Sequence, residues 1–247
     1  MSVSPQRALR WLWLGTVPYD TAWSVQRELA AERSSGTLAD DVVLLLEHPP
    51  VYTMGRNGEA AHLRDGSAAL RAAGAEYLEV DRGGSVTFHG PGQLVAYPIV
   101  SLAGVFPIPR HEAHGDVLRY VRALEQALID TAAAFGVQAD RRAPHTGVWA
   151  GDEKLAAIGV KLARGVTTHG VAINVDTDLS WFDLVVACGI DGARAASLAS
   201  LGAPGLTPGA VAPVLAGALA RAFGERLFEG DAALRARVTA LSAPAAA

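Results

Sequence analysis

The sequence is poor in cysteine, in long apolar runs and in excess positive charge. Its 247 residues include one cysteine, Cys188, which excludes an internal disulfide and favours a reducing, cytoplasmic setting. No apolar run approaches the ~18 residues of a membrane span, and residues 1–14 lack the apolar stretch and small-residue cleavage site of a signal peptide. The net charge of -4 argues against a nucleic-acid binder. We therefore expect neither a membrane nor a nucleic acid among its partners.

Hydrophobic residues make up 50% of the chain, which is enough to bury a sizeable core. Apolar periodicity predicts helices from Pro18 to about residue 31, over about 115–135 and, last in the chain, over 208–228. The predicted strands are short and apolar, and they cover 8–14, 42–46, 94–100, 147–150, 154–160 and 171–174. Strands and helices do not alternate strictly, so we predict an α+β fold, a mixed sheet with helices on one face. We expect a single domain over 1–235 and a flexible tail over 236–247.

The helix over 115–135 has a clear apolar stripe. Val117, Val121, Leu124 and Leu128 recur at helical spacing and are its expected buried face. Gly136 is the expected stop, because glycine adopts the left-handed conformation that ends many helices.

Cys188 is a candidate nucleophile. Only a few per cent of an ordinary thiol, with a pKa near ~8.5, is thiolate at neutral pH, so a catalytic cysteine needs a nearby cation, helix N-terminus or base. The alternative is that Cys188 is a small buried hydrophobe. The candidate activating groups are six of the histidines and two lysines, namely His48, His89, His111, His114, His145, His169, Lys154 and Lys161.

Lys154 opens an otherwise apolar run that reads as a strand. Partial burial would lower the pKa of its ammonium group and let it exchange protons near neutrality. The alternative is a solvated lysine that discourages pairing at a sheet edge.

The segment 82–93 is rich in glycine but lacks the Gly-Lys-Ser/Thr of a phosphate loop and is not a dinucleotide fingerprint. Arg82 and the backbone N–H groups around its paired glycines could face a polarised acyl group, and His89 and Gln93 could face a cleft. The alternative is a long hairpin loop. His111 and His114 have no evident third ligand, so we expect no metal.

In their order along the chain, several motifs together resemble the lipoyl(octanoyl) transferase family, the octanoyl-[acyl-carrier-protein]:protein octanoyltransferases of lipoate biosynthesis. The resemblance extends from about Leu44 to Ser197. Its pieces are EHPPVYTMGR at 47–56, RGG at 82–84, Thr87 with HGPGQL at 89–94, KLAAIG at 154–159, HGVAINV at 169–175 and CGI at 188–190. Each motif alone is weak evidence, whereas their joint occurrence in this order is specific.

The resemblance implies roles for individual residues. In that family a cysteine carries the acyl group as a thioester and a lysine lowers the pKa of that cysteine, and these positions are Cys188 and Lys154. The family's substrate-binding segments correspond to Arg82, Gly83, Gly84, Ser85, Val86, Thr87, Phe88, His89, Ala157, Ile158, Gly159, Gly170, Val171 and Ala172. Two departures stand near the cysteine: Ala187 replaces a usual proline, and residues 194–198 differ from the usual Val-Thr-Ser-Leu segment.

The resemblance also implies the fold and the partners. The fold would be that of the biotin and lipoate protein ligase catalytic domain, a mixed sheet flanked by helices, and no cofactor would be needed. Octanoyl-acyl carrier protein would be the donor. The acceptors would be lipoyl domains of 2-oxoacid dehydrogenase E2 subunits and the glycine cleavage H protein.

Two other functions fit part of the sequence. An ATP-dependent lipoate or biotin ligase of the same fold would activate a free acid as an acyl-adenylate. The sequence has no obvious Gly- and Arg-rich adenylate loop, and such a ligase would not need Cys188. A non-catalytic module that recognises acylated carrier domains is supported only by Ala187 and the altered 194–198 segment.

Overall fold

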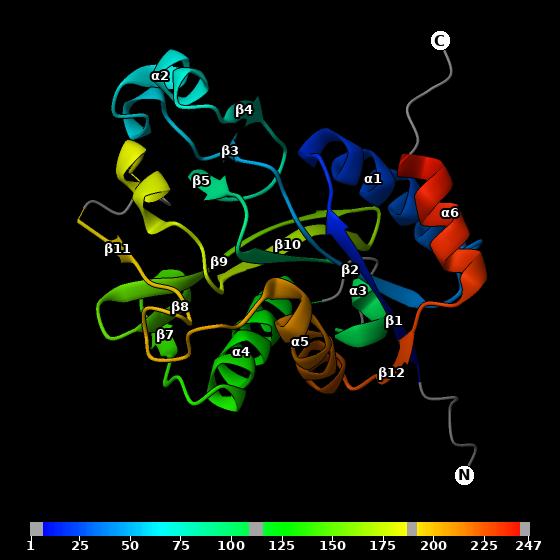
Figure 1. Cartoon of the computed structure of the whole chain (residues 1–247). Coiled ribbons are helices and arrows are strands. Elements are labelled where there is room, and N and C mark those ends of the chain that lie inside the picture. Colours follow the sequence, from blue (N-terminus) through cyan, green and yellow to red (C-terminus); the bar gives the residue numbers. More distant parts are fainter. Residues whose placement is uncertain (1–6, 109–115, 187–191, 243–247) are drawn as a thin grey trace.

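The structure is a computed structural model that describes residues 7–108, 116–186 and 192–242. Within these ranges the centre is a mixed sheet of order β12-β1-β2-β6-β10-β9-β8-β7, with β11 paired to β9 (Figure 1). Its strands are β1 (Ala8–Thr16), β2 (Asp41–Glu47), β6 (Gln93–Ile99), β7 (Asp140–Arg142), β8 (His145–Ala150), β9 (Glu153–Ala163), β10 (Val166–Asn174), β11 (Arg194–Ala195) and β12 (Arg226–Glu229). A second sheet of order β4-β3-β5 consists of β3 (Val51–Met54), β4 (Glu76–Glu79) and β5 (Val86–His89).

Helices cover both faces of the large sheet, and the predicted α+β fold is confirmed. Helices α4 (Val117–Ala134) and α5 (Pro208–Phe223) pack together on one face, whereas α1 (Tyr19–Ser35) and α6 (Ala232–Ser242) pack on the other (Figure 1). The expectation of helices on one face is wrong. All of Val42–Leu46 in β2 is buried, and such a continuous apolar run belongs to a strand covered on both sides. The shorter elements are α2 (Gly66–Ala72), α3 (Leu102–Val105), η1 (Ala60–His62) and η2 (Leu179–Leu184).

The last predicted helix is too long. Helix α5 ends at Phe223, and Gly224 follows with a φ of 70°, the left-handed cap that stops a helix. The chain then adds strand β12, which pairs in parallel with β1, and helix α6. Val238 of α6 is buried against the α1 side of the sheet, so residues 236–242 are helical where the sequence predicted a flexible tail.

The buried stripe of α4 begins one turn later than predicted. Leu124 and Leu128 are fully buried, whereas Val117 in the first turn is 42% exposed. Tyr120 and Thr131 complete the stripe instead. Tyr120 lies one turn before Leu124 and Thr131 one turn after Leu128, but a pattern of purely apolar residues does not include them.

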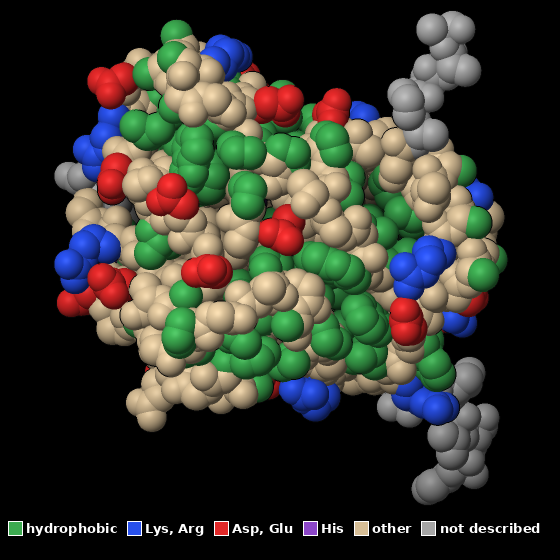
Figure 2. Space-filling model, in the orientation of Figure 1, with side chains coloured by type: hydrophobic (Ala, Val, Ile, Leu, Met, Phe, Trp, Pro, Cys, Tyr) green, Lys and Arg blue, Asp and Glu red, His purple; other side chains and the backbone are tan. Residues whose placement is uncertain are grey.

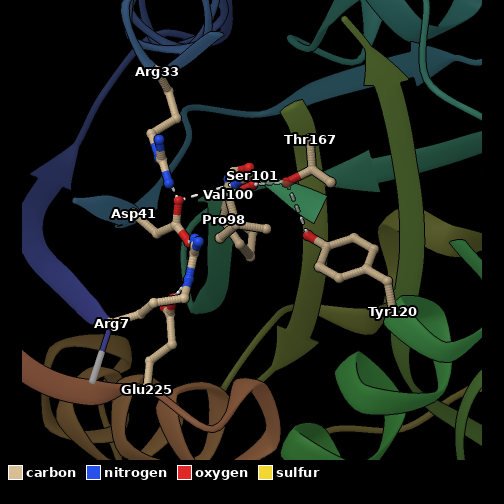
Figure 3. Close-up of polar contacts among 9 residues, drawn as sticks. All are labelled: Arg7, Arg33, Asp41, Pro98, Val100, Ser101, Tyr120, Thr167 and Glu225. Atoms are coloured by element: carbon tan, nitrogen blue, oxygen red, sulfur yellow. Dashed lines mark hydrogen bonds and ion pairs between the residues drawn. The ribbon is translucent and has the colours of Figure 1, made fainter. Parts of the chain in front are cut away.

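A cluster of buried ions ties the ends of the domain together. The Arg7 guanidinium binds the carboxylates of Asp41 and Glu225, and Arg33 binds Asp41 from α1 (Figure 3). Asp41 also accepts a hydrogen bond from the backbone N–H of Ser101. Both carboxyl side chains are inaccessible to solvent, and their hydrogen bonds to arginines from two other segments stabilise these polar groups in the interior.

Candidate active site

A cavity of about 260 Å³ lies on the α1 side of the large sheet, with β9 and β10 as its floor. The two strands are antiparallel, and their register pairs Ala157 with Ala172 and Gly159 with Gly170. All four residues line the cavity. The two predicted substrate-binding segments are therefore neighbours across one β-hairpin, and their small side chains leave the space open.

The larger residues of the same segments are also among those lining the cavity, but their side chains pack in the core. Ile158 and Val171 pair with each other, and both pack in the core under α4 and α5. Side chains alternate between the two faces of a strand, so the pattern small-large-small places bulk in the core and room in the cavity.

Lys154 reaches the cavity because β9 is irregular. On a regular strand, residues 154 and 157 would point to opposite faces, since an odd number of positions separates them. The register between β8 and β9 shifts between Val148–Ala156 and Trp149–Lys154, and Leu155 and Ala156 both pack in the core. This β-bulge turns Lys154 to the same side as Ala157, and both line the cavity. Bulges commonly re-aim a side chain beside an active site.

The loop before β5 covers the floor. The buried Arg82 donates hydrogen bonds from Nη2 to the backbone oxygen of Thr53 at 2.6 Å and to its hydroxyl at 2.8 Å, and from Nη1 to the Gly83 oxygen at 3.0 Å. A Cβ atom at residue 159 would lie 3.0 Å from Arg82 Cδ and 3.1 Å from the Gly83 oxygen. Gly159 is thus required for this loop to approach the strand so closely. The guanidinium fixes the loop in addition to lining the cavity.

Buried aromatic and histidine side chains form another part of the wall, among them Tyr19, Tyr97, His89 and His169. His48 supports Tyr97 from behind. Its Nδ1 lies 2.6 Å from the Val17 carbonyl oxygen and must donate, so its Nε2 accepts the hydrogen bond from the Tyr97 hydroxyl at 2.7 Å. Burial lowers the pKa of His48 to about 4, which fits this neutral tautomer.

His89 has its tautomer set in the same way. The side-chain amide of Gln93 donates to the Asn174 side chain at 2.9 Å and to the Phe88 carbonyl, so its oxygen accepts from His89 Nδ1 at 2.7 Å. Burial lowers the pKa of His89 well below its usual range. His89 is therefore neutral, and its Nε2 is the unprotonated nitrogen. His89 lines the cavity, as predicted, whereas Gln93 is not among the lining residues and orients His89 from beside it.

The other candidate lysine is engaged elsewhere. Lys161 forms an ion pair with Asp81, which also binds His169 Nε2 at 2.9 Å. Burial lowers the pKa of His169 to about 4, although Asp81 opposes the shift. Lys161 is not among the residues that line the cavity.

The structure brings together most of the predicted site residues. Of the predicted set, Arg82, Gly84, Ser85, Thr87, His89, Lys154, Ala157, Ile158, Gly159, Gly170, Val171 and Ala172 line the cavity. Gly83, Val86 and Phe88 do not: Val86 and Phe88 pack in a hydrophobic cluster behind β5, and Gly83 donates its N–H to the Val160 oxygen at 2.9 Å. Val86 and Phe88 alternate with the cavity residues Ser85, Thr87 and His89, as strand periodicity requires.

Sequence reasoning missed several lining residues, namely Tyr19, Val95, Tyr97, Pro144 and Thr146. Val95 and Tyr97 alternate along β6, which pairs with β10, and this alternation was the available signal. His145 and His169, named only as possible activating groups, also line the cavity.

The segment with Cys188 and Ala187 lies outside the described residues, as do His111 and His114. The chain on its C-terminal side is described, and it returns to the site. In strand β11, Ala195 pairs with Lys154 and Arg194 pairs with Glu153. The Ala196 N–H donates to the Lys154 carbonyl oxygen at 3.0 Å, and Ala196 and Leu198 are buried. Residues 194–198, which differ from the usual family segment, therefore pair with β9 beside Lys154.

Within the described ranges, none of the helices is both long and apolar enough to cross a bilayer. In the same ranges, no cluster of three or more His, Cys, Asp or Glu side chains is placed to hold a metal ion.

Solved structures with this arrangement are catalytic domains that handle lipoate or biotin. A putative lipoate protein ligase from Thermoplasma acidophilum with bound lipoic acid superimposes with a TM-score of 0.69 at 16% identity, covering 94% of this chain and 92% of that one. Lipoate-protein ligase A bound with ATP gives 0.65 at 13% identity, with coverage of 96% and 94%. A biotin protein ligase from Aquifex aeolicus gives 0.51 at 13% identity, with coverage of 87% and 70%. The fold is therefore that of the lipoate and biotin protein ligase catalytic domains, as predicted.

Comparison with related sequences identifies the family within this group of folds. The sequence model of the Lipoyl protein ligase A/B catalytic domain matches residues 18–220, and the chain belongs to this family. An octanoyltransferase from Gloeobacter violaceus is 48% identical over 216 residues, which cover 87% of this chain and 90% of the relative. One from Chloroflexus aurantiacus is 50% identical over 197 residues, with coverage of 78% and 84%. The predicted resemblance to octanoyltransferases is confirmed.

Proposed function

We propose that this protein transfers an octanoyl group from octanoyl-acyl carrier protein to a lysine of a lipoyl domain, in lipoate biosynthesis, through a thioester on Cys188. Relatives named octanoyltransferase share about half of its residues over most of their length. The observation that supports the catalytic pair is strand β11: Ala195 pairs with Lys154, so the chain just after the Cys188 segment lies beside Lys154.

The first half-reaction forms the acyl-enzyme. Charged Lys154 stabilises the Cys188 thiolate, because a positive charge within a few ångströms favours the anionic form. The thiolate attacks the thioester carbonyl, the new carbon–sulfur bond forms, and the carrier's thiolate leaves and takes a proton. One thioester replaces another, so little driving force is needed.

The second half-reaction delivers the acyl group. The ammonium of the acceptor lysine must lose one proton before it can attack and a second as the amide forms. Lys154, neutral after protonating the carrier's thiol, accepts one of them, and the other passes to solvent. The carbon–nitrogen bond forms, the carbon–sulfur bond breaks, and the Cys188 thiolate is restored. Conversion of a thioester to an amide is downhill, so ATP is not required.

The cavity is suited to the acyl chain. Ala157, Gly159, Gly170 and Ala172 give it a smooth floor without polar side chains. Burial contributes up to ~0.8 kcal/mol for each methylene group, so a chain of eight carbons gains affinity along this floor. The acceptors we expect are lipoyl domains of 2-oxoacid dehydrogenase E2 subunits and the glycine cleavage H protein.

Intact mass of the protein after incubation with octanoyl-acyl carrier protein tests the proposal. We expect the wild type to gain one octanoyl group without ATP, Cys188→Ser to form no thioester, and Lys154→Arg to acylate slowly. A normal thioester adduct on Cys188→Ser would refute the nucleophile. Product formation only with free octanoate and ATP would instead indicate a ligase of the kind found with ATP among the structural relatives. Carrier binding without any turnover would indicate a binding module.

A further inference from the structure

Lys154 lies in a cradle made by two residues of strand β8. Its Nζ is 5.4 Å from the centroid of the Trp149 ring, and the two residues are direct partners in the β8–β9 register. Gly147, two positions before Trp149, has a φ of 124°, and a Cβ atom there would lie 2.9 Å from Lys154 Cε. Gly147 thus leaves the space that the lysine stem occupies, and the indole lies beside its ammonium group.

The Trp149 side chain interacts through its ring face rather than through its polar edge, because Lys154 and the Arg142 guanidinium, whose central carbon is 5.1 Å from the ring centroid, both lie against the ring. Trp149 is only 2% exposed, yet among the described residues its Nε1–H has no hydrogen-bond partner. A buried tryptophan usually finds a partner for that group. The face of an indole attracts an ammonium ion more strongly than other aromatic rings do, and most strongly where water is excluded.

We propose that Trp149 is a positioning residue for Lys154. The indole face attracts the ammonium group and holds it on the cavity side of β9, while the β-bulge at Leu155–Ala156 sets the direction of the lysine stem. This inference rests on the proposed function, because it assumes that charged Lys154 activates Cys188. It adds a group that is not among the residues lining the cavity and that acts through the lysine.

The pH dependence of Cys188 alkylation by iodoacetamide tests the inference, since the chain has no other cysteine. We expect Trp149→Leu to raise the alkylation midpoint by about one pH unit and to slow octanoyl transfer at pH 7 roughly tenfold. Trp149→Phe, which keeps a weaker ring face, should fall between wild type and Trp149→Leu. Trp13→Leu, on β1 and packed on the opposite core, is the matched control: it should lower the Tm but leave the midpoint unchanged.

Fluorinated tryptophans at position 149 distinguish the electrostatic effect of the ring face from the effect of its packing. Each added fluorine weakens the negative face of the ring but barely changes its volume, so the midpoint should rise stepwise with fluorine number. These variants keep the indole shape and remain informative even where Trp149→Leu does not fold.

The outcomes distinguish the two proposals. A midpoint that rises with Lys154→Met but is unchanged by fluorination or by Trp149→Leu overturns the role of Trp149 and leaves the proposed function standing. A midpoint that Lys154→Met does not move overturns the lysine–cysteine pairing itself, and the role of Trp149 with it.

Discussion

The two faces of the β9–β10 strand pair differ sharply, although the same two strands build both. Toward α4 and α5 the pair presents Leu155, Ile158, Val171 and Ile173, which pack in the main core. Toward the cavity it presents alanines and glycines together with Lys154. One face therefore supplies stability and the other supplies space, and the β-bulge is where a charged residue changes sides. The two faces should respond to substitution in opposite ways.

Filling the cavity face should have the largest effect. Ala172→Leu inserts a branched chain over the floor, where the acyl group is proposed to lie. We expect kcat/KM for octanoyl transfer to fall by at least ~100-fold, because small displacements of a reacting group have effects of that size. Steady-state transfer assays measure the loss, and a folded variant with normal activity would contradict the assignment of the cavity to the acyl chain.

Truncating a side chain on the core face should lower stability and leave activity intact. Ile173 is the next residue along β10 and is fully buried. Ile173→Ala should lower the free energy of unfolding by about 2–5 kcal/mol, measured by urea denaturation. The activity of the folded fraction should stay near wild type. A loss of kcat without a loss of stability would show that the two faces are not separable.

Acid should lower the stability of the fold through two buried histidines at the cavity wall. Burial lowers the pKa of His48 and His169 to about 4, so between pH ~6.5 and ~4 the unfolded chain binds protons that the folded chain excludes. Stability is therefore lost as the pH falls through this window, by up to ~3 kcal/mol for each histidine. His48→Gln should reduce this acid slope, since glutamine can replace both hydrogen bonds without titrating. An unchanged slope would contradict the buried, neutral state of His48.

The smallest effect is expected far from the cavity, in the cluster of Figure 3. Burial and the adjacent Asp41 raise the pKa of Glu225 to about 8, against the opposing pull of Arg7. A raised pKa favours the protonated form in the fold, so the stability that Glu225 contributes is lost as the pH rises toward 8. Glu225→Gln cannot ionise, and we expect it to be more stable than wild type by about 1 kcal/mol at pH 9 and unchanged in activity. Equal unfolding free energies at pH 9 would rule out the raised pKa.

The outer surface gives a contrast with these buried charges. On the face shown in Figure 2, acidic and basic side chains are interspersed without a large area of one sign. This agrees with the small net charge of -4, and such a surface lacks the basic stripe typical of a nucleic-acid binder.

The sequence predicted the strands that build the site more reliably than the directions of their side chains. Apolar runs located β2, β6 and β9 to within a few residues, but of β10 they predicted only 171–174, whereas the strand begins at Val166. Alternation could not place Lys154, because the bulge that turns it toward the cavity depends on pairing with β8. The long helix beyond Gly224 was mispredicted for a similar reason: a glycine cap and a parallel partner on β1 override helical spacing.

The site residues that escaped prediction are those whose role depends on tertiary contacts. Tyr19 and Tyr97 belong to an amphipathic helix and a buried strand, where an aromatic residue reads as core. Only the fold places them beside His89 and His169 in one wall. The small residues of β9 and β10 were found through the family resemblance, whereas their pairing across the sheet explains why they are small.

The central claim is that the acyl group resides on Cys188 between donor and acceptor, and a rapid-quench single turnover tests it most directly. Wild-type protein is mixed with octanoyl-acyl carrier protein and a lipoyl domain, and the acylated species are followed by mass. We predict that octanoyl-Cys188 appears first and decays into octanoyl-lysine at a rate no slower than turnover. Octanoyl-lysine that forms while Cys188 stays unmodified, or a Cys188 thioester that the lipoyl domain cannot discharge, would contradict the account.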